Sequence, residues 1–294
     1  MKKIILLLAA FYAGAAGASV YSFDSPYFSY EEDDCRCLCL CLSYQGVTKK
    51  GASWRLRNLT PLDEKTLSHI QGDPRVMIHF ADGKPRTPEQ TNEQVTLIRN
   101  RYQSGIPKGG WAIDVGGVGE EHMVGLLTLG ASSAPKPGRA EMGRKIAFED
   151  QGTGIGTSVM DAVVKEMGPE IRRWGLQQDL PLIKERFTCY EGQALSEIYV
   201  TSAPANVGSW LTQVRSGFKP MKRVKEEDPI VLHYESSGIE DFGALQNALL
   251  NRFKEDDLVP EKPYKLFDIK GDKRTVSYVE KYDSVRYHFT YSFS

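Results

Sequence analysis

Apolar residues recur along the middle of the chain with two periods, and each period predicts one kind of element. Alternation with period two and short apolar runs between turn residues predict strands, whereas apolar residues three and four positions apart predict helices. The predicted strands are 53–57, 111–115, 123–129, 140–147, 196–201, 219–224 and 230–234. The predicted helices are 62–70, 87–103, 156–167, 171–176 and 206–216. This mixture predicts an α/β (α+β) domain with a sheet flanked by helices.

The ends of several helices carry recognisable signals. Thr87-Pro88-Glu89-Gln90 places a capping threonine, a proline at the first helical position and an acid in the first turn, which predicts a helix start. Gly168 follows the apolar set of the helix before it and is predicted to end that helix as a C-terminal cap. Gly217 is predicted to end the 206–216 helix in the same way, with Phe218 folding back as its apolar partner.

The two ends of the chain differ from the middle. Lys2 and Lys3, an apolar run and the small residues Ala16-Gly17-Ala18 predict a signal peptide over 1–18, and hence export to the periplasm or the medium. For this segment, a buried helix or an uncleaved anchor is the alternative. For the location of the protein, the cytoplasm is the alternative. Residues 19–52 show no clear period and are interpreted as a Cys-rich arm or linker outside the core. The main domain is predicted over 53–235, and a small C-terminal α/β extension over 236–294.

Four cysteines in the arm alternate with other residues, at Cys35, Cys37, Cys39 and Cys41. If the segment is extended, the four thiols share one face and the intervening leucines the other. Thiols two positions apart on one strand close poor disulfides, and a metal site lacks the usual C-x-x-C spacing. Lipidation and a solvated tail without a special role stay open as alternatives. We therefore predict no metal site.

Composition narrows the classes of partner. The chain has 294 residues with a net charge of −1, so nothing indicates binding to a nucleic-acid backbone. After the predicted signal, no apolar run is long enough to span a bilayer. The hydrophobic share of 41% is that of an ordinary globular protein with a core of normal size.

The segment most typical of a binding site is Gln151-Gly152-Thr153-Gly154-Ile155-Gly156, at a predicted strand-to-helix turn. Glycines leave backbone N–H groups unshielded there, and the positive end of the following helix favours a pyrophosphate. The segment is neither a P-loop, because no Gly-Lys-Ser/Thr follows, nor the dinucleotide fingerprint, because the spacing is G-x-G-x-G. A tight turn without a ligand is the alternative.

Sequence motifs in the correct order give this turn a context. Gln151, Gly154 and Gly156 resemble the acetyl-CoA signature of the GNAT superfamily, and the strand 141–146 resembles the strand before it. Further positions that resemble the family, in the branch that acetylates α-amino groups of ribosomal proteins, are Leu56-Arg57-Asn58-Leu59, Asp63, Trp111-Ala112-Ile113, Asn206-Val207-Gly208-Ser209 and Gly217-Phe218. The resemblance implies the GNAT fold: a mixed, mostly antiparallel sheet whose fourth and fifth strands splay apart. It covers about residues 53 to 235.

The resemblance also implies acetyl-CoA as co-substrate and a set of residues that bind it. These residues are Arg144, Lys145, Ile146, Gln151, Gly152, Thr153, Gly154, Ile155, Gly156, Thr157, Asn206 and Ser209. The pantetheine arm is expected along the strand near Arg144 to Ile146, with a backbone N–H near Ile146 as donor to the oxyanion.

Catalytic residues are less well defined by the sequence. We expect Glu141 and Asn206 to be catalytic, Glu141 as the base; an exposed strand glutamate that pairs with Arg139 or Arg144 is the alternative. His122 and Glu197 are lesser candidates for the base. The position at which many relatives carry a tyrosine that protonates the thiolate holds Gln213, whose amide is no acid at neutral pH. The role then falls to solvent or Tyr199.

Two functions are consistent with these features. The first is an N-acetyltransferase in which an amine of a protein or small molecule attacks acetyl-CoA directly in a ternary complex. The second is an exported GNAT-fold binding or interaction protein without catalysis.

Overall fold

A computed structural model describes residues 25–32, 38–80, 83–117, 119–133, 135–177, 179–202, 206–220 and 287–293. The strands are β1 (Phe28–Glu32), β2 (Leu38–Val47), β3 (Ser53–Asn58), β4 (Gly109–Val115), β5 (His122–Gly130), β6 (Arg139–Ile146), β7 (Glu197–Ser202), β8 (Lys219–Pro220) and β9 (Tyr287–Ser292). The α-helices are α1 (Glu64–Gly72), α2 (Pro74–Met77), α3 (Pro88–Gln103), α4 (Ile155–Ala162), α5 (Gly168–Leu176), α6 (Pro181–Phe187) and α7 (Val207–Arg215). Short turns of helix are η1 (Pro61–Asp63), η2 (Phe148–Asp150) and the π-helical η3 (Val163–Met167).

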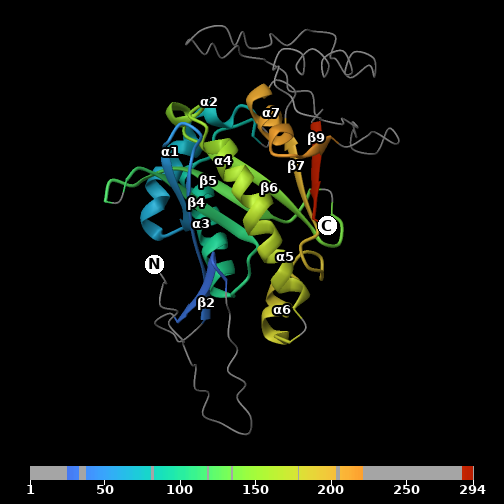
Figure 1. Cartoon of the computed structure of the whole chain (residues 1–294). Coiled ribbons are helices and arrows are strands. Elements are labelled where there is room, and N and C mark those ends of the chain that lie inside the picture. The colour runs from blue at the N-terminus through green and yellow to red at the C-terminus, as the bar shows by residue number, and fades with distance from the viewer. Residues whose placement is uncertain are drawn as a thin grey trace.

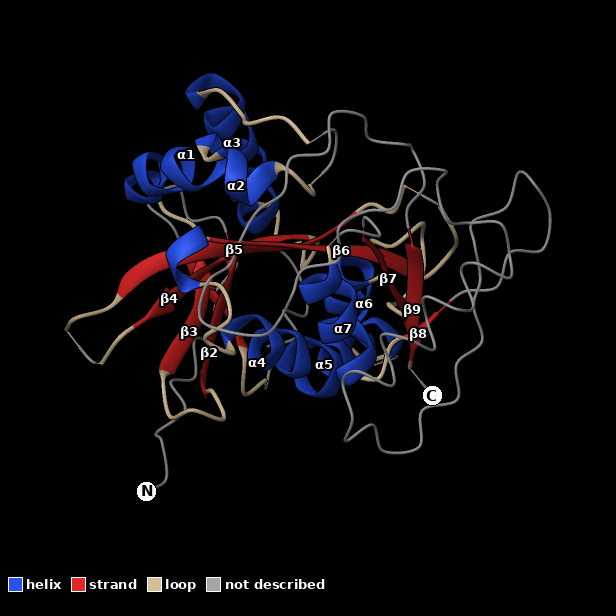
Figure 2. Cartoon of the chain, turned by 90° about the horizontal axis from the view of Figure 1, so that it is seen from above, coloured by secondary structure: helices blue, strands red, loops and turns tan. Residues whose placement is uncertain are grey.

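The described strands form one sheet in the order β1-β2-β3-β4-β5-β6-β7-β9-β8. All neighbours are antiparallel except β6 and β7, which run parallel. Helices cover both faces: α1, α2 and α3 lie on one side, and α4 to α7 lie on the other (Figures 1 and 2). This confirms the predicted fold class, a mixed and mostly antiparallel sheet flanked by helices.

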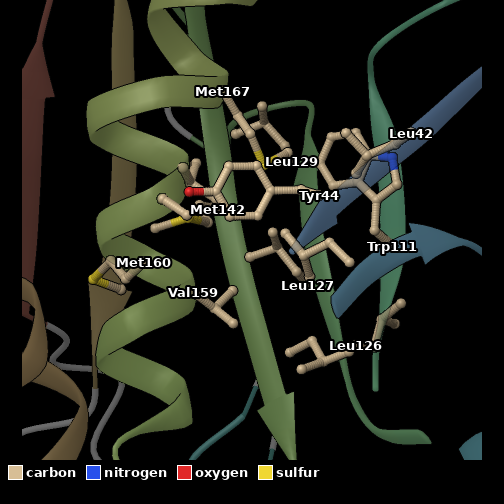
Figure 3. Close-up of a cluster of buried hydrophobic side chains, with 14 of the residues drawn as sticks. Leu42, Tyr44, Trp111, Leu126, Leu127, Leu129, Met142, Val159, Met160 and Met167 are labelled. Carbon is tan, nitrogen blue, oxygen red and sulfur yellow. The ribbon is translucent and has the colours of Figure 1, made fainter. Parts of the chain in front are cut away.

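The core lies on both faces of the sheet: α1 and α3 bury Leu67, Val95 and Ile98 on one side, and the helix that starts at Ile155 packs on the other. In Figure 3, Val159 and Met167 of that helix lie near Met142 and Leu129 of the strands beneath them. The helix is continuous in chain order through α4, η3 and α5, because the π-helical turn joins the two α-helices without a break. On this face one long apolar helix surface packs on the central strands.

Most of the predicted elements of the middle are confirmed. Thr87 accepts a hydrogen bond from the Gln90 N–H in a capping box, as its sequence indicated. Gly217 has φ +88° after α7, and Phe218 is buried behind it. The helix expected over 171–176 is confirmed as the second part of α5, and α6 is an addition, because the sequence predicted no second helix between that helix and the strand at 196.

The interpretation of residues 19–52 as an arm outside the core is wrong for the described part. β1 and β2 pair in register with each other, and β2 continues onto β3. Leu40, Leu42 and Tyr44 are buried, whereas Cys39 and Cys41 are half-exposed on the opposite face, as the alternation predicted. The interpretation failed because the alternation of cysteines with leucines was not recognised as the pattern of an amphipathic strand. Cys35, Cys37 and the predicted signal peptide lie outside the described residues.

Two further expectations are corrected. Gly168 does not end its helix, because its φ of −63° and ψ of −49° are helical and the chain continues into α5. A Cβ there would lie 2.3 Å from Cζ of Phe293, so the glycine is required for close packing instead. The boundary at 235 also fails, since β9 lies between β7 and β8 in the main sheet and buries Phe289. The expected strand over 230–234 lies outside the described residues.

Candidate functional site

A gap opens in the sheet between β6 and β7. The two strands pair only from Arg139 to Glu141, and within the described ranges the rest of β6 has no strand beside it on that edge. This is the splay that the fourth and fifth strands of the GNAT fold were expected to show. A strand that ends its pairing early leaves backbone donors and acceptors available for an extended ligand.

The direction of the backbone groups follows from the pairing on the other edge of β6. The Ala147 N–H donates to the Val124 carbonyl on the β5 side at 2.7 Å. Because successive residues of a strand turn their backbone groups to alternate edges, Lys145 faces β5 as well. Arg144 and Ile146 then face the gap. Of the three residues expected to pair with a pantetheine arm, Lys145 therefore does not offer its backbone to the gap.

Each glycine of the turn after β6 has a physical reason. Gly152 and Gly154 have φ +75° and +95°, in the left-handed region that side chains disfavour. Gly156 has no such angle. A Cβ at Gly156 would lie 3.2 Å from both Nε of Arg144 and Cδ1 of Ile146, so its role is close packing on β6. The turn needs all three glycines, each for its own reason.

Side chains fix this turn against the strand. Nε2 of Gln151 donates to the Ile146 carbonyl at 3.1 Å, and Nη1 of Arg144 donates to the Gly156 carbonyl at 2.7 Å. The Thr153 hydroxyl donates to the Asp150 carbonyl at 2.7 Å. Burial lowers the pKa of Arg144 to about 10, which leaves the guanidinium charged at neutral pH beneath the start of α4.

The start of α4 has the properties of an anion site. Gly154 is its N-cap and contributes no side chain, and the first intrahelical bond comes from Ser158 N–H to the Gly154 carbonyl. The N–H groups of Ile155, Gly156 and Thr157 therefore have no partner within the helix. Together with the positive end of the helix, these donors suit phosphate oxygens. Residues 151 to 157 form the turn and the helix start here, and their binding of the cofactor stays a prediction.

Sequence reasoning missed two contacts from the turn between β2 and β3. Nζ of Lys50 donates to the Gly152 carbonyl at 3.5 Å, and the Thr48 side chain lies beside Gly154. Both residues belong to the segment that had been assigned to an arm. The Lys49-Lys50-Gly51 run was the available signal, since glycine is typical of turns and the two lysines give this turn a positive charge.

The candidate bases are held in other interactions. Glu141 accepts the Ser133 N–H at 2.6 Å, rather than pairing with Arg139 or Arg144. At the usual rise per residue it lies about 16 Å along the strand from Ile146. Glu197 is buried in an ion pair with Arg139, and His122 is exposed at the start of β5. The catalytic role of Glu141 stays a prediction.

The other catalytic candidates have structural partners. Oδ1 of Asn206 caps α7 by accepting the Ser209 N–H at 3.2 Å. Nε2 of Gln213 donates to the Ser202 hydroxyl at 2.7 Å, and the Gln213 side chain is buried between β7 and α7. The Tyr199 ring packs against the Arg139 guanidinium, 5.1 Å from the ring centre. The site thus gathers the glycine turn and the end of β6, while Glu141 lies further along β6, and Tyr199 and Gln213 contact Arg139 and Ser202.

Within the described residues, no helix is long and apolar enough to cross a membrane. The same part of the chain contains no group of three or more His, Cys, Asp or Glu side chains placed to hold a metal ion.

Comparison with known proteins agrees with this architecture. The sequence model of the acetyltransferase (GNAT) domain matches residues 54–219. No curated protein matches the chain significantly.

Solved structures that resemble the chain include three acetyltransferases. One is a GNAT-family acetyltransferase from Bacillus anthracis, 16% identical, which covers 58% of this chain and 85% of its own with a TM-score of 0.42. Another is the ribosomal L7/L12 α-N-protein acetyltransferase RimL in complex with coenzyme A, which is 17% identical; the match covers 58% of this chain and 85% of that chain with a TM-score of 0.40. The third is spermidine N-acetyltransferase from Vibrio cholerae in complex with CoA and spermine, which is 16% identical; the match covers 62% of this chain and 89% of that chain with a TM-score of 0.42.

Proposed function

Because the chain belongs to the GNAT acetyltransferases, with acetyl-CoA as co-substrate, we propose that it acetylates a primary amine of a protein or small molecule by direct attack in a ternary complex. The observation that carries the proposal is the glycine turn fixed to the end of β6 at the opening of the β6–β7 gap. The anion-binding N–H groups and the strand edge meet there, which is the pairing that a pyrophosphate followed by an extended pantetheine arm needs.

The residues of the site have separate tasks in this proposal. The N–H groups of residues 155–157 hold the pyrophosphate, and Lys50 adds a positive charge beside them. The backbone of Arg144, which faces the gap, pairs with the amides of the pantetheine arm. The Ile146 carbonyl is already bound by Gln151, so the Ile146 N–H is the group left to stabilise the oxyanion that forms when the amine adds to the thioester carbonyl.

Calorimetric titration with CoA tests the binding half of the proposal. In Gly154→Val a branched side chain obstructs the phosphates and disfavours the φ of +95°. Loss of two charge-assisted hydrogen bonds weakens CoA binding by about a hundredfold or more. Gly192→Val is the matched control, because Gly192 also has positive φ, +75°, with open space around it and no part in the turn. Circular dichroism shows whether each variant folds.

Equal CoA affinity of wild type and a folded Gly154→Val variant contradicts the proposed site. Mass spectrometry after incubation with acetyl-CoA tests the transfer half, with spermidine and a peptide carrying a free α-amino group as acceptors. These represent the small-molecule and protein amines. Absence of CoA binding by the wild-type protein overturns the proposed function altogether.

A further inference from the structure

A buried lysine lies at the end of β6, beside the gap. Lys145 is 3% exposed, and its Nζ lies 4.1 Å from the centre of the Phe80 ring. None of the ion pairs among the described residues includes it. A buried ammonium without a carboxylate partner is costly, because the charge loses its hydration and gains no counter-ion. The chain keeps an amine at a position where an apolar side chain fills the same space at lower cost.

The side chain of Lys145 faces the side of the sheet opposite the glycine turn. Arg144 and Ile146 point toward the start of α4, because Gly156 packs against both. Side chains alternate along a strand, so Lys145 points to the face covered by α1 and α2. Phe80, which follows α2, lies over Lys145 and over Gly143, the residue two positions earlier on that face. The two neighbours of Lys145 in the chain are the residues whose backbone faces the gap, so its amine lies within one side-chain length of that edge.

Burial, and then the nearby charge of Arg86, lower the pKa of Lys145 to about 7. Other charged or titratable groups on the elements that cover this face are Glu64, Lys65 and His69 on α1, Asp73 and Arg75 at α2, His79 and Lys84 after it, and Arg139 and Glu141 on β6 itself. Asp73 and Arg75 are paired with each other, and Glu141 is bound to the Ser133 N–H. A large share of Lys145 is therefore neutral at neutral pH and able to accept a proton.

The reaction needs a group that accepts and returns a proton, and the other candidate residues are held in structural interactions. Glu197 is buried in an ion pair, and Gln213 is bound to Ser202 where many relatives carry an acid. An amine acceptor is mostly protonated at neutral pH and must lose a proton before or during attack. The released thiolate must gain one.

We propose that Lys145 is the general base of the acetyl transfer, an inference that rests on the proposed function. The acceptor ammonium first loses one proton to water and becomes a free amine. As the bond from its nitrogen to the acetyl carbon forms, the neutral Nζ of Lys145 takes a second proton from that nitrogen. The carbon–sulfur bond then breaks with its electron pair on sulfur. The Lys145 ammonium returns the proton to this thiolate, which leaves as CoA with the free amine of Lys145 restored.

Three variants test the assignment. Lys145→Met keeps the length of the side chain and removes the amine, whereas Lys145→Arg keeps a positive charge that does not titrate. Lys165→Met is the matched control, because Lys165 is an exposed lysine paired with Asp161 on the far side of the fold. Should Lys145→Met fail to fold, Lys145→Arg provides the same comparison. CoA affinity of each folded variant is measured by calorimetry, and the rate of transfer to spermidine and to the α-amino peptide is measured from pH 5 to 10.

We expect the wild-type rate to rise with pH through a midpoint near 7. Lys145→Met and Lys145→Arg should bind CoA as wild type does, lose about a hundredfold or more in kcat and lose this midpoint. A retained midpoint and kcat in either folded variant overturns the assignment while the proposed function stands. Failure of the wild-type protein to bind CoA, or to acetylate either acceptor, overturns the proposed function and this assignment with it.

A second readout needs no acceptor. Lysine labelled with ¹³C at Cε gives one NMR resonance for Lys145, assigned by its loss in Lys145→Met. A midpoint between about pH 6 and 8 is expected, and a midpoint above 9 overturns the assignment.

Discussion

Replacing Lys145 by methionine should stabilise the protein at neutral pH, which is unusual for a change in a buried side chain. The lysine has a pKa of about 7 in the fold and an ordinary value of 10.5 when the chain is unfolded. Between these values the unfolded chain binds a proton that the folded protein does not. The free energy of unfolding of the wild type therefore rises with pH over this window, and it is at its lowest with respect to this group below pH 7.

The magnitude follows from the size of that pKa difference. At 1.36 kcal/mol per unit, the wild type bears a cost of at most about 5 kcal/mol at and below pH 7. Water penetration and relaxation reduce such costs in real proteins, so we expect Lys145→Met to gain about 2 kcal/mol or more at pH 6. Near pH 11 the gain should vanish, because lysine is then neutral in both states.

Urea unfolding at intervals from pH 6 to 11, followed by circular dichroism, measures the difference directly. Lys165→Met is again the control, because an exposed lysine has little effect on stability at any pH. A Lys145→Met variant less stable than wild type at pH 6, or a difference that does not change with pH, would refute the argument that Lys145 is buried without a counter-ion.

Three further predictions concern the fold. Arg57→Met leaves Asp114 buried without its main partner and should lower the free energy of unfolding by about 3–5 kcal/mol at pH 7. Although burial raises the pKa of Asp63, Arg57 holds that pKa below its usual range. The loss of stability should therefore shrink as the pH falls below 4, which acid titration of both proteins measures. A chain that begins at Gly51 loses β1 and β2 and should aggregate or melt without cooperativity, because four buried side chains contribute about 1.5–3 kcal/mol each; a sharp thermal transition like that of the full chain would contradict this. Gly168→Ala should lower stability by about 1–3 kcal/mol through overpacking against Phe293, measured by urea unfolding, and an unchanged midpoint would show that the contact is loose.

Sequence reasoning succeeded where local chemistry alone decides the conformation. The Thr87 cap and the glycine turn from Gly152 to Gly156 depend on neighbouring residues, and both form as predicted. It failed where partners lie far away in the chain. A glycine after an apolar helical run is typical of a helix end, but Gly168 packs against Phe293 instead. No pattern in the neighbouring residues predicts that contact.

The candidate site divides in the same way. The turn and the end of β6 were predicted because a motif places them in one short segment. Lys50 came from a segment set aside for lack of period. The side chain of Lys145 was overlooked because the motif assigns that position only a backbone role. Its burial depends on Phe80, more than sixty residues earlier in the chain, and only the fold brings the two together.

The place of β9 in the sheet affects how the protein is made. β9 comes last in chain order among the described strands, yet it separates β7 from β8 and supplies the only partner that β8 has among them. Segment 221–286 must therefore leave the ribosome before the far edge of the sheet can pair. Closing a segment of that length costs about 4 kcal/mol of chain entropy. During synthesis, the edge of β7 that pairs with β9 therefore stays unpaired until β9 is made. A nascent chain stopped just before Tyr287 is the species most exposed to aggregation and proteolysis.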